Sequence, residues 1–281
     1  MPSVADAVLA AALGLLGVPV GLVAGRLVFL FPRHDPEPDD DSGPPPPSCP
    51  HCAADIPFWS WLPAARVRAF GLHGRCPSCA RTVPSSRAVI WATALLYALI
   101  GLTIGAQEAV RAPLWPAALL FLGAVGALLS VIDARVHRLP NAIVLPSYPI
   151  ALLLVIGAAF TAPAFAAAAP AVPWPGDLTG ALAGMAVLAA FYWLLWFIYP
   201  AGMGWGDVKL SGLLGLYLGW GGFSSVVSGT LLAFLLSAVF GLALMAVGRA
   251  TRKSQIPLGP FMIGGAFAVV LFGDPAPLLL S

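Results

Sequence analysis

The stretch LTGALAGMAVLAAFYWLLWFIY, residues 178–199, contains no charged side chain and is long enough to cross a bilayer as one helix. It is followed by GMGWGDVKL, residues 202–210, in which an acid comes after alternating glycines. A carboxylate beside a membrane span is costly to place, so we expect another feature of the protein to offset that cost. Of the 281 residues in the chain, 59% are hydrophobic and only 9% are charged, which excludes an ordinary soluble domain.

Similar apolar runs elsewhere predict an all-α, polytopic membrane helix bundle of about eight spans embedded in the lipid bilayer. The predicted spans are residues 4–31, 88–106, 113–132, 142–164, 178–199, 208–220, 224–248 and 259–279. No basic segment precedes the first span, so we expect no cleaved signal peptide. The net charge of +2 is too small to indicate nucleic-acid binding.

Basic residues predict the orientation of these spans, because cytoplasmic loops near spans retain Lys and Arg. With eight spans, one side of the membrane receives Arg33, Arg66, Arg68, Arg75, Arg81, Arg87, Arg135, Arg138, Arg249, Arg252 and Lys253. Arg111 falls on the other side. We therefore expect a multi-pass protein of the inner (cytoplasmic) membrane, with its N-terminus outside and the loop of residues 32–87 in the cytoplasm.

The four cysteines of the chain all lie in this loop, as the pairs CPHC (Cys49, Cys52) and CPSC (Cys76, Cys79). Two C-x-x-C pairs can bring four thiolates to one tetrahedral zinc ion. Such a site is structural, because four protein ligands leave no open position for water. The alternative is two redox or disulfide pairs, which a reducing cytoplasmic location disfavours.

Two other parts of the loop differ in composition: one is acidic and rich in proline, and the other is apolar. HDPEPDDDSGPPPPS, residues 34–48, is acidic and proline-rich and predicts a linker, since it cannot bury enough apolar surface to fold. IPFWSWLPAARVRAFG, residues 56–71, is apolar, and we expect it to pack on the membrane surface or on neighbouring helix ends.

Two acids, Asp133 and Asp207, fall at the cytoplasmic ends of predicted spans and thus at one membrane depth. Two carboxylates held together in a partly desolvated place tend to share a proton. One can then activate water while the other donates to the developing oxyanion, which is the chemistry of aspartyl proteolysis. Glycines let a substrate backbone approach closely, so we predict substrate-binding or supporting roles for Gly204, Gly206 and Lys209.

Other interpretations of these residues remain open. The two aspartates can be ordinary helix-end charges neutralised by Arg135, Arg138 and Lys209. They can also be carriers in a proton-coupled or ion-coupled transporter, although the chain shows no internal repeat. In a third interpretation, the chain is a zinc-bearing scaffold of a secretion system in which the aspartates are structural.

At these residues the chain resembles the type IV prepilin peptidases, membrane aspartyl proteases with a G-x-G-D element. The resemblance covers nearly the whole chain, through GLVAGR, CPHC, IPFWSWL, GRCPSC, TALLY, IDARVHRLPN, GMGWGDVKL and IPLGPFMIGG. It implies that Asp133 and Asp207 are the catalytic pair and that the four cysteines bind zinc. It also implies the substrate: the leader of a prepilin or pseudopilin precursor, cut on the cytoplasmic side just before its hydrophobic helix.

Many members of this family also methylate the new N-terminal amine with S-adenosylmethionine. Where members commonly show G-S-F-L-N-V, this chain reads GRLVFLF, with Arg26 in place of the serine. Ile90 stands where a glutamate usually occurs. The resemblance therefore predicts peptidase activity, and S-adenosylmethionine as a cofactor only if methylation is retained.

These observations predict three parts of the chain. Residues 1–31 form the first transmembrane helix, residues 32–87 the cytoplasmic linker and zinc module, and residues 88–281 the transmembrane aspartyl protease core.

Overall fold

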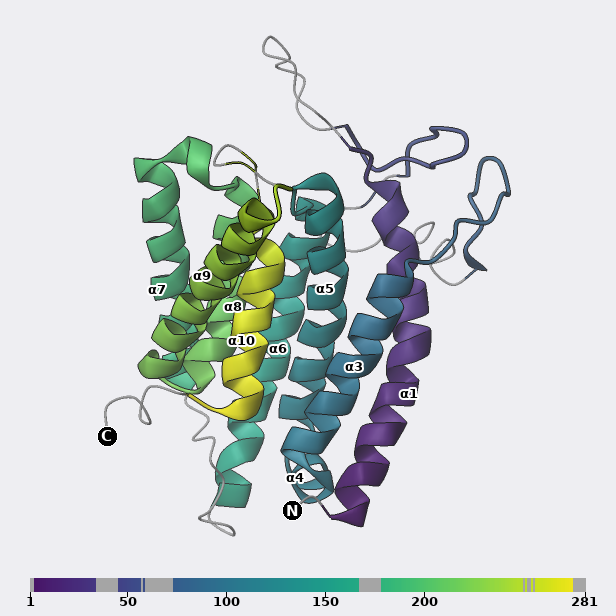
Figure 1. Cartoon of the computed structure of the whole chain (residues 1–281). Helices are drawn as coiled ribbons and strands as arrows, with labels where there is room; N and C mark the ends of the chain where they lie inside the picture. Colours follow the sequence, from purple (N-terminus) through teal and green to yellow (C-terminus); the bar gives the residue numbers. More distant parts are fainter. Residues whose placement is uncertain are drawn as a thin grey trace. The chain divides into compact units, whose positions relative to one another are not determined.

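The computed structural model of the chain (Figure 1) describes residues 3–33, 45–56, 58, 73–166, 178–249, 251, 254 and 256–274. Most of the predicted linker and of the apolar insert of residues 56–71 lie outside these described residues. Arg66, Arg68, Arg252 and Lys253, four of the basic residues on the predicted cytoplasmic side, also lie outside the described residues.

The described residues contain helices and no strand, which confirms the all-α class. The helices are α1 Val4–Leu27, η1 Val28–Leu30, α3 Arg87–Ile104, α4 Ala106–Arg111, α5 Leu114–Val136, α6 Asn141–Ala166, α7 Leu178–Ile198, η2 Pro200–Gly202, α8 Trp205–Trp220, α9 Phe223–Ala246 and α10 Gly259–Phe272. Helices suit these apolar sequences because lipid offers no hydrogen-bond partner, so the backbone must satisfy its own N–H and C=O groups.

A helix occurs at each predicted span, but two of them are shorter than a bilayer requires. Six helices in the described part of the chain are long and apolar enough to cross a membrane, and the protein is therefore a multi-pass membrane protein. The exceptions are α8, with 16 residues, and α10, with 14 residues. At 1.5 Å per residue they extend about 24 and 21 Å, less than the roughly 30 Å of a hydrocarbon core.

Two helix boundaries near the predicted aspartates differ from the sequence-based expectation. The span predicted for residues 208–220 begins at Trp205, so Asp207 lies inside the first turn of α8. The span predicted for residues 113–132 continues to Val136, so Asp133 lies inside the last turn of α5. Both acids are thus integral to helices.

The chain forms two compact units, each of which contains residues from separate parts of the sequence. The first unit comprises Met1–Gly105 and Leu120–Pro146, and the second comprises Ala106–Leu119 and Ser147–Ser281.

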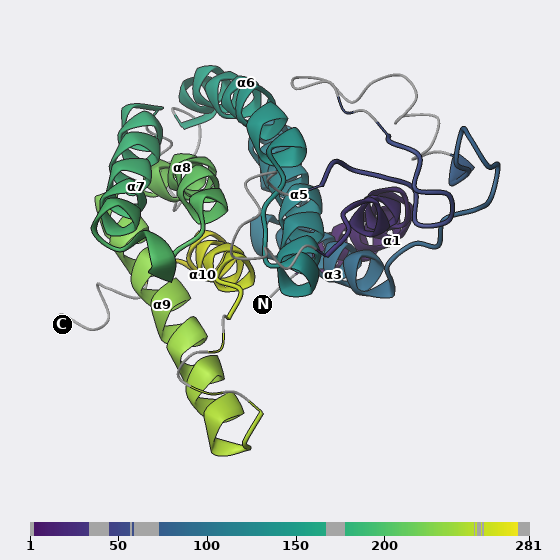
Figure 2. The same ribbon diagram turned by 90° about the horizontal axis from the view of Figure 1, so that it is seen from above.

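In the first unit, α1 and α3 lie side by side along their length (Figures 1 and 2). Glycines on α1 make this contact possible: a Cβ atom at Gly17 would lie 2.6 Å from the Ala94 Cα, and one at Gly21 would lie 2.7 Å from the Ile90 Cα. Such small-residue contacts are the usual basis of helix association in membranes, where apolar burial provides little driving force.

In the second unit, α8 packs against α7, α9 and α10 (Figure 2) and is buried along nearly its whole length. The α7–α8 contact brings backbone against backbone, because a Cβ at Gly184 of α7 would lie 2.5 Å from the Gly215 carbonyl oxygen and 2.6 Å from the Gly219 Cα. A helix enclosed by protein does not need to match the bilayer thickness. This enclosure accounts for the short length of α8.

The α7–α8 contact yields a stability prediction. Gly184→Ala places a methyl group against the α8 backbone and should destabilise the protein by about 1–3 kcal/mol, the usual range for overpacking. Gly264→Ala on α10 is the matched control, since a Cβ there would meet no atom of the described residues within 4 Å. Thermal unfolding in detergent micelles should show a lower melting temperature for Gly184→Ala only. Equal melting temperatures for the two variants would contradict the close contact.

Candidate active site and metal site

Asp207 occupies the first turn of α8, three residues after the N-cap residue Gly204. The Asp207 N–H donates to the Gly204 carbonyl at 3.0 Å. Its carboxylate folds back over the cap, because a Cβ at Gly204 would lie 3.3 Å from the Asp207 Oδ2. Only 9% of Asp207 is exposed. The positive end of the helix dipole therefore faces a nearly buried carboxylate and stabilises its negative charge.

Three side chains that sequence reasoning missed surround the start of α8. The Tyr148 hydroxyl on α6 donates to the Lys209 carbonyl at 2.5 Å. The Ser211 hydroxyl donates to the Val208 carbonyl at 2.8 Å and approaches the Leu188 carbonyl of α7 at 3.3 Å. Tyr192 of α7 is 1% exposed and within electrostatic range of Asp207. A tyrosine inside an apolar span is the one signal in the sequence that could have suggested such a role.

Lys209, predicted as a supporting residue, reaches over an aromatic ring. Its Nζ lies 5.6 Å from the centre of the Trp205 ring, a cation–π arrangement. Trp205 in turn packs on Trp196 of α7, with ring centres 4.6 Å apart. The lysine thus helps to fix the first turn of α8 against α7.

Asp133 lies at the C-terminal end of its helix, whereas Asp207 lies at the N-terminal end of its own. It is 4% exposed in the last turn of α5, and its carbonyl accepts the His137 N–H at 2.8 Å. His137 has a φ of +51°, the left-handed conformation that commonly terminates a helix. Because the C-terminal end of a helix dipole is negative, this position disfavours a charged carboxylate.

The arginines considered as neutralising partners for Asp133 face aromatic rings. The Arg135 guanidinium lies 4.5 Å from the centre of the Phe29 ring, and that of Arg138 lies 5.9 Å from the centre of the Phe31 ring.

Asp133 belongs to the first unit and Asp207 to the second.

The four cysteines come together as predicted, with all four Sγ atoms within 4.8 Å of one another. The Cys49 and Cys79 sulfurs are 3.9 Å apart, and those of Cys52 and Cys76 are 3.8 Å apart. A disulfide would need about 2.05 Å. Zinc–sulfur bonds of about 2.3 Å in tetrahedral geometry separate the sulfurs by roughly 3.8 Å. The spacing therefore fits a tetrahedral metal ion.

Both C-x-x-C pairs fold in the same way. In each pair the first cysteine's Sγ accepts a backbone N–H two residues later, from His51 at 3.5 Å and from Ser78 at 3.4 Å. Each turn ends in a left-handed alanine, Ala53 or Ala80, with a φ of +54° in both cases. N–H groups directed at sulfur favour thiolates, which are the metal-binding form.

The thiols of this cluster have pKa values shifted in opposite directions. Burial raises the pKa of Cys76. The backbone N–H groups of Cys79 and Ser78 lower it by more, so that the resulting pKa is about 6. A backbone hydrogen bond at Ala54 lowers the pKa of Cys52, but desolvation and the neighbouring sulfurs raise it to about 12. Four thiolates so close together repel one another, so full ionisation requires a cation among them.

Hydrogen bonds join the cysteine module to the helix pair of the first unit. The Ser48 N–H donates to the Leu30 carbonyl at 2.9 Å, and the Ser85 hydroxyl donates to the Leu22 carbonyl at 2.7 Å. Gly74 has a φ of +65°, and a Cβ there would lie 2.9 Å from the Arg26 guanidinium carbon. The module is therefore docked on the end of α1.

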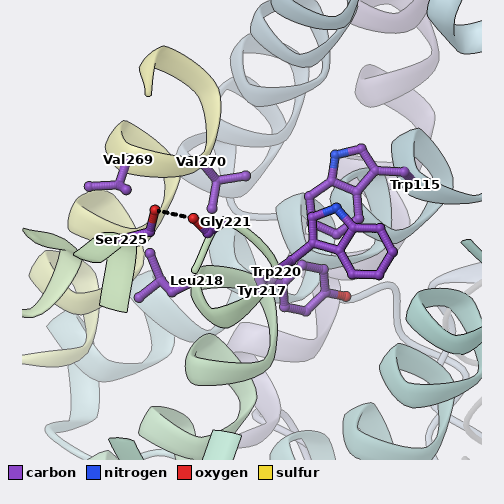
Figure 3. A pocket seen from close by; sticks show the side chains of 8 residues that line it. All are labelled: Trp115, Tyr217, Leu218, Trp220, Gly221, Ser225, Val269 and Val270. Carbon is purple, nitrogen blue, oxygen red and sulfur yellow. Dashed lines mark hydrogen bonds between the residues drawn. The ribbon is translucent and has the colours of Figure 1, made fainter. Parts of the chain in front are cut away.

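A small pocket lies at the C-terminal end of α8, whereas Asp207 lies in the first turn of that helix. Figure 3 shows the side chains that line the pocket. Its walls are Trp115, Tyr217, Leu218, Trp220, Gly221, Ser225, Val269 and Val270. Trp115 stacks on Trp220 with ring centres 4.8 Å apart, and the Ser225 hydroxyl donates to the Gly221 carbonyl at 3.2 Å. The pocket is too closely filled to admit a water molecule, so these residues pack the end of the helix.

Comparison with known proteins identifies relatives over most of the chain. Residues 119–246, which include both aspartates, match the model of the type IV leader peptidase family. A prepilin leader peptidase/N-methyltransferase of Burkholderia pseudomallei is 33% identical over 240 residues, which cover 83% of this chain and 69% of the relative.

Proteins of the same name from two other bacteria are similar. The Aeromonas salmonicida protein is 30% identical over 87% of this chain and 78% of its own. The Pseudomonas aeruginosa protein is 30% identical over 81% of this chain and 71% of its own. No solved structure matches the chain significantly. The chain therefore belongs to the type IV leader peptidase family.

Proposed function

We propose that this protein is an aspartyl endopeptidase that removes the leader of type IV prepilins or pseudopilins at the cytoplasmic face of the inner membrane. The observation that carries this proposal is that Asp133 and Asp207 are both nearly buried at helix ends inside the region matched by the family model. The prepilin substrate is inferred from the names of the relatives. The basic residues of the loops support the cytoplasmic face as the side of cleavage.

The two helix ends suggest different roles for the two acids. Asp207 at the N-terminus of α8 is the partner that the helix dipole stabilises as a carboxylate, so it accepts a proton from the attacking water. Asp133 at the C-terminus of α5 is disfavoured as an anion, so it carries the shared proton and donates to the carbonyl oxygen of the scissile peptide. Water is the nucleophile. When the tetrahedral intermediate collapses, the C–N bond breaks, Asp207 passes its proton to the departing amine nitrogen, and Asp133 takes back the proton of the hydroxyl, so both residues return to their starting states.

Residues close to Asp207 in the sequence support its turn and bind the substrate in this proposal. Gly204 leaves room for the Asp207 carboxylate, since any side chain there would crowd Oδ2. Gly206 and Lys209 support the same turn and bind the extended backbone of the leader. In this proposal, residues 88–281 form the protease core, residues 1–31 the first span, and residues 32–87 a cytoplasmic linker and metal module.

The four-cysteine module binds a structural zinc ion in this proposal. The near-tetrahedral sulfur spacing and the two equivalent turns support it. The ion would supply folding energy to a module with little apolar core and would take no part in peptide cleavage.

Methylation of the product is the least supported activity. The relatives' names include N-methyltransferase. In this chain Arg26, which replaces a serine common in the family, packs against the backbone of Gly74. The position is thus used for docking the module, and S-adenosylmethionine is a cofactor only if methylation is retained.

The aspartyl mechanism predicts the effect of removing either carboxylate. Asp133→Asn and Asp207→Asn should each lower cleavage of a co-expressed pilin-like precursor by at least about 100-fold, the scale of general acid–base catalysis. The matched control is Asp55→Asn in the exposed part of the metal module, which should cleave normally. Membrane abundance of all variants is measured alongside. Normal cleavage by either core variant would favour the transporter or scaffold interpretation.

Metal binding predicts a loss of stability on changing a ligand. Purified protein should contain about one zinc ion per chain, because four thiolates complete one tetrahedral site. Cys76→Ser should lose the ion and unfold at a lower temperature, whereas Ser78→Ala in the same turn should change neither property. Elemental analysis and thermal unfolding measure both. A metal-free protein as stable as the zinc-bound form would disprove the structural role.

Methylation can be assessed on the cleaved product. We expect an unmodified N-terminal amine in the mature pilin, because Arg26 occupies a position linked to methylation in relatives. Mass spectrometry of the mature N-terminus measures this directly, with a product of the Pseudomonas aeruginosa relative for comparison. A mass increased by one methylene group would show that methylation is retained.

A further inference from the structure

Three arginines gather at one end of the first unit, where α5 ends and the chain leaves η1. Arg33 follows η1, Arg135 lies in the last turn of α5, and Arg138 lies two residues beyond that helix. The Arg33 Nε donates to the Arg135 carbonyl at 3.0 Å, and the Arg138 Nη2 donates to the Pro45 carbonyl at 3.2 Å. Figure 1 shows these ends of α1 and α5 at the same side of the unit.

Phenylalanines fix two of these guanidinium groups. Arg135 lies over the Phe29 ring and Arg138 over the Phe31 ring. Phe29, Phe31 and Arg33 alternate along one segment, so apolar rings and a cation reach the cluster from the same stretch of backbone. A stacked guanidinium keeps its plane fixed and directs its remaining N–H groups in set directions.

Some of these N–H groups are buried without an acceptor. Within the described residues, the Arg135 Nη1 and the Arg138 Nε have no hydrogen-bond partner although neither atom is exposed. An unsatisfied buried donor destabilises a protein, and more so when it is charged. Burial also lowers the pKa of Arg138, which indicates poor solvation of its cation. An anion with several acceptor oxygens would relieve both effects.

The position of the cluster indicates the source of that anion. In a membrane protein, side chains at helix ends meet the lipid headgroup layer. Basic clusters between helix ends can bind the phosphates of anionic lipids, and arginine matches phosphate oxygens through two parallel hydrogen bonds. Phe29 is partly exposed and suits the boundary with the acyl chains, whereas Phe31 is buried and holds Arg138 from within the protein. We propose that Arg33, Arg135 and Arg138 bind the phosphodiester headgroup of an anionic phospholipid.

The test compares lipid binding by the full-length protein, purified in an uncharged detergent. Native mass spectrometry measures retained dioleoyl-phosphatidylglycerol and, separately, dioleoyl-phosphatidylcholine. Arg135→Gln and Arg138→Gln should each weaken phosphatidylglycerol binding about fivefold and the double variant roughly 25-fold, the scale of one basic residue near an anionic surface. Wild type should bind phosphatidylcholine less tightly than phosphatidylglycerol.

Matched variants distinguish a specific phosphatidylglycerol site from non-specific electrostatic attraction of the lipid to basic residues. Arg87→Gln removes the same charge from an exposed position at the start of α3, and its binding should stay within about twofold of wild type. Arg138→Lys keeps the charge but loses the planar donor group, so it should still bind phosphatidylglycerol more weakly than wild type. Melting temperatures without lipid verify folding, and the lysine variant serves if the glutamine variant does not fold.

Three results would overturn the proposal. One is an Arg87→Gln effect as large as those of the cluster variants, which would mean non-specific electrostatics. Another is equal binding of the two lipids by wild type. The third is thermal stabilisation by inorganic phosphate as strong as that by phosphatidylglycerol, which would identify a site for a free anion.

Discussion

The close contact of α7 with α8 at Gly184, Gly215 and Gly219 is the constraint on which the second unit depends. In lipid there is little hydrophobic driving force for helix association, so van der Waals contact between backbones that approach closely at glycines provides much of the attraction. Because α8 is enclosed by α7, α9 and α10, it can be short and can carry an acid, a serine and several glycines without exposing them to lipid. The same enclosure holds Asp207 in the first turn of α8, where the positive end of the helix dipole stabilises its negative charge.

The sequence was sufficient to predict the all-α class, the place of each apolar helix and the assembly of the cysteines. Each of these follows from a local pattern, either a long apolar run or a repeated C-x-x-C spacing. Helix ends were less predictable. The sixth span was predicted to begin at residue 208, but α8 already begins at Trp205, because packing against α7 and the Tyr148 hydrogen bond outweigh weak helix propensity.

Contacts between distant residues could not be read from the sequence. Nothing in the spacing of Tyr148, Ser211 and Tyr192 links them to the turn that carries Asp207. Likewise, Arg135 and Arg138 are close to Asp133 in sequence, yet their guanidiniums lie over phenylalanines that come about 100 residues earlier, because aromatic faces stabilise arginine at an apolar boundary. The family assignment rests on the comparisons, and the structure adds the contrasting helix ends of the two acids.

The docking of the cysteine module on α1 also bears on how the first two long helices find each other. Residues 31–86 separate α1 and η1 from α3, and a long connection makes closing the helix pair entropically unfavourable. The bonds from Ser48 to Leu30 and from Ser85 to Leu22 draw both ends of this connection to the same helix end. A metal ion joining Cys49 and Cys52 to Cys76 and Cys79 would therefore act as a cross-link that shortens the effective loop. Assembly of a transmembrane hairpin would then depend on an ion acquired on the aqueous side.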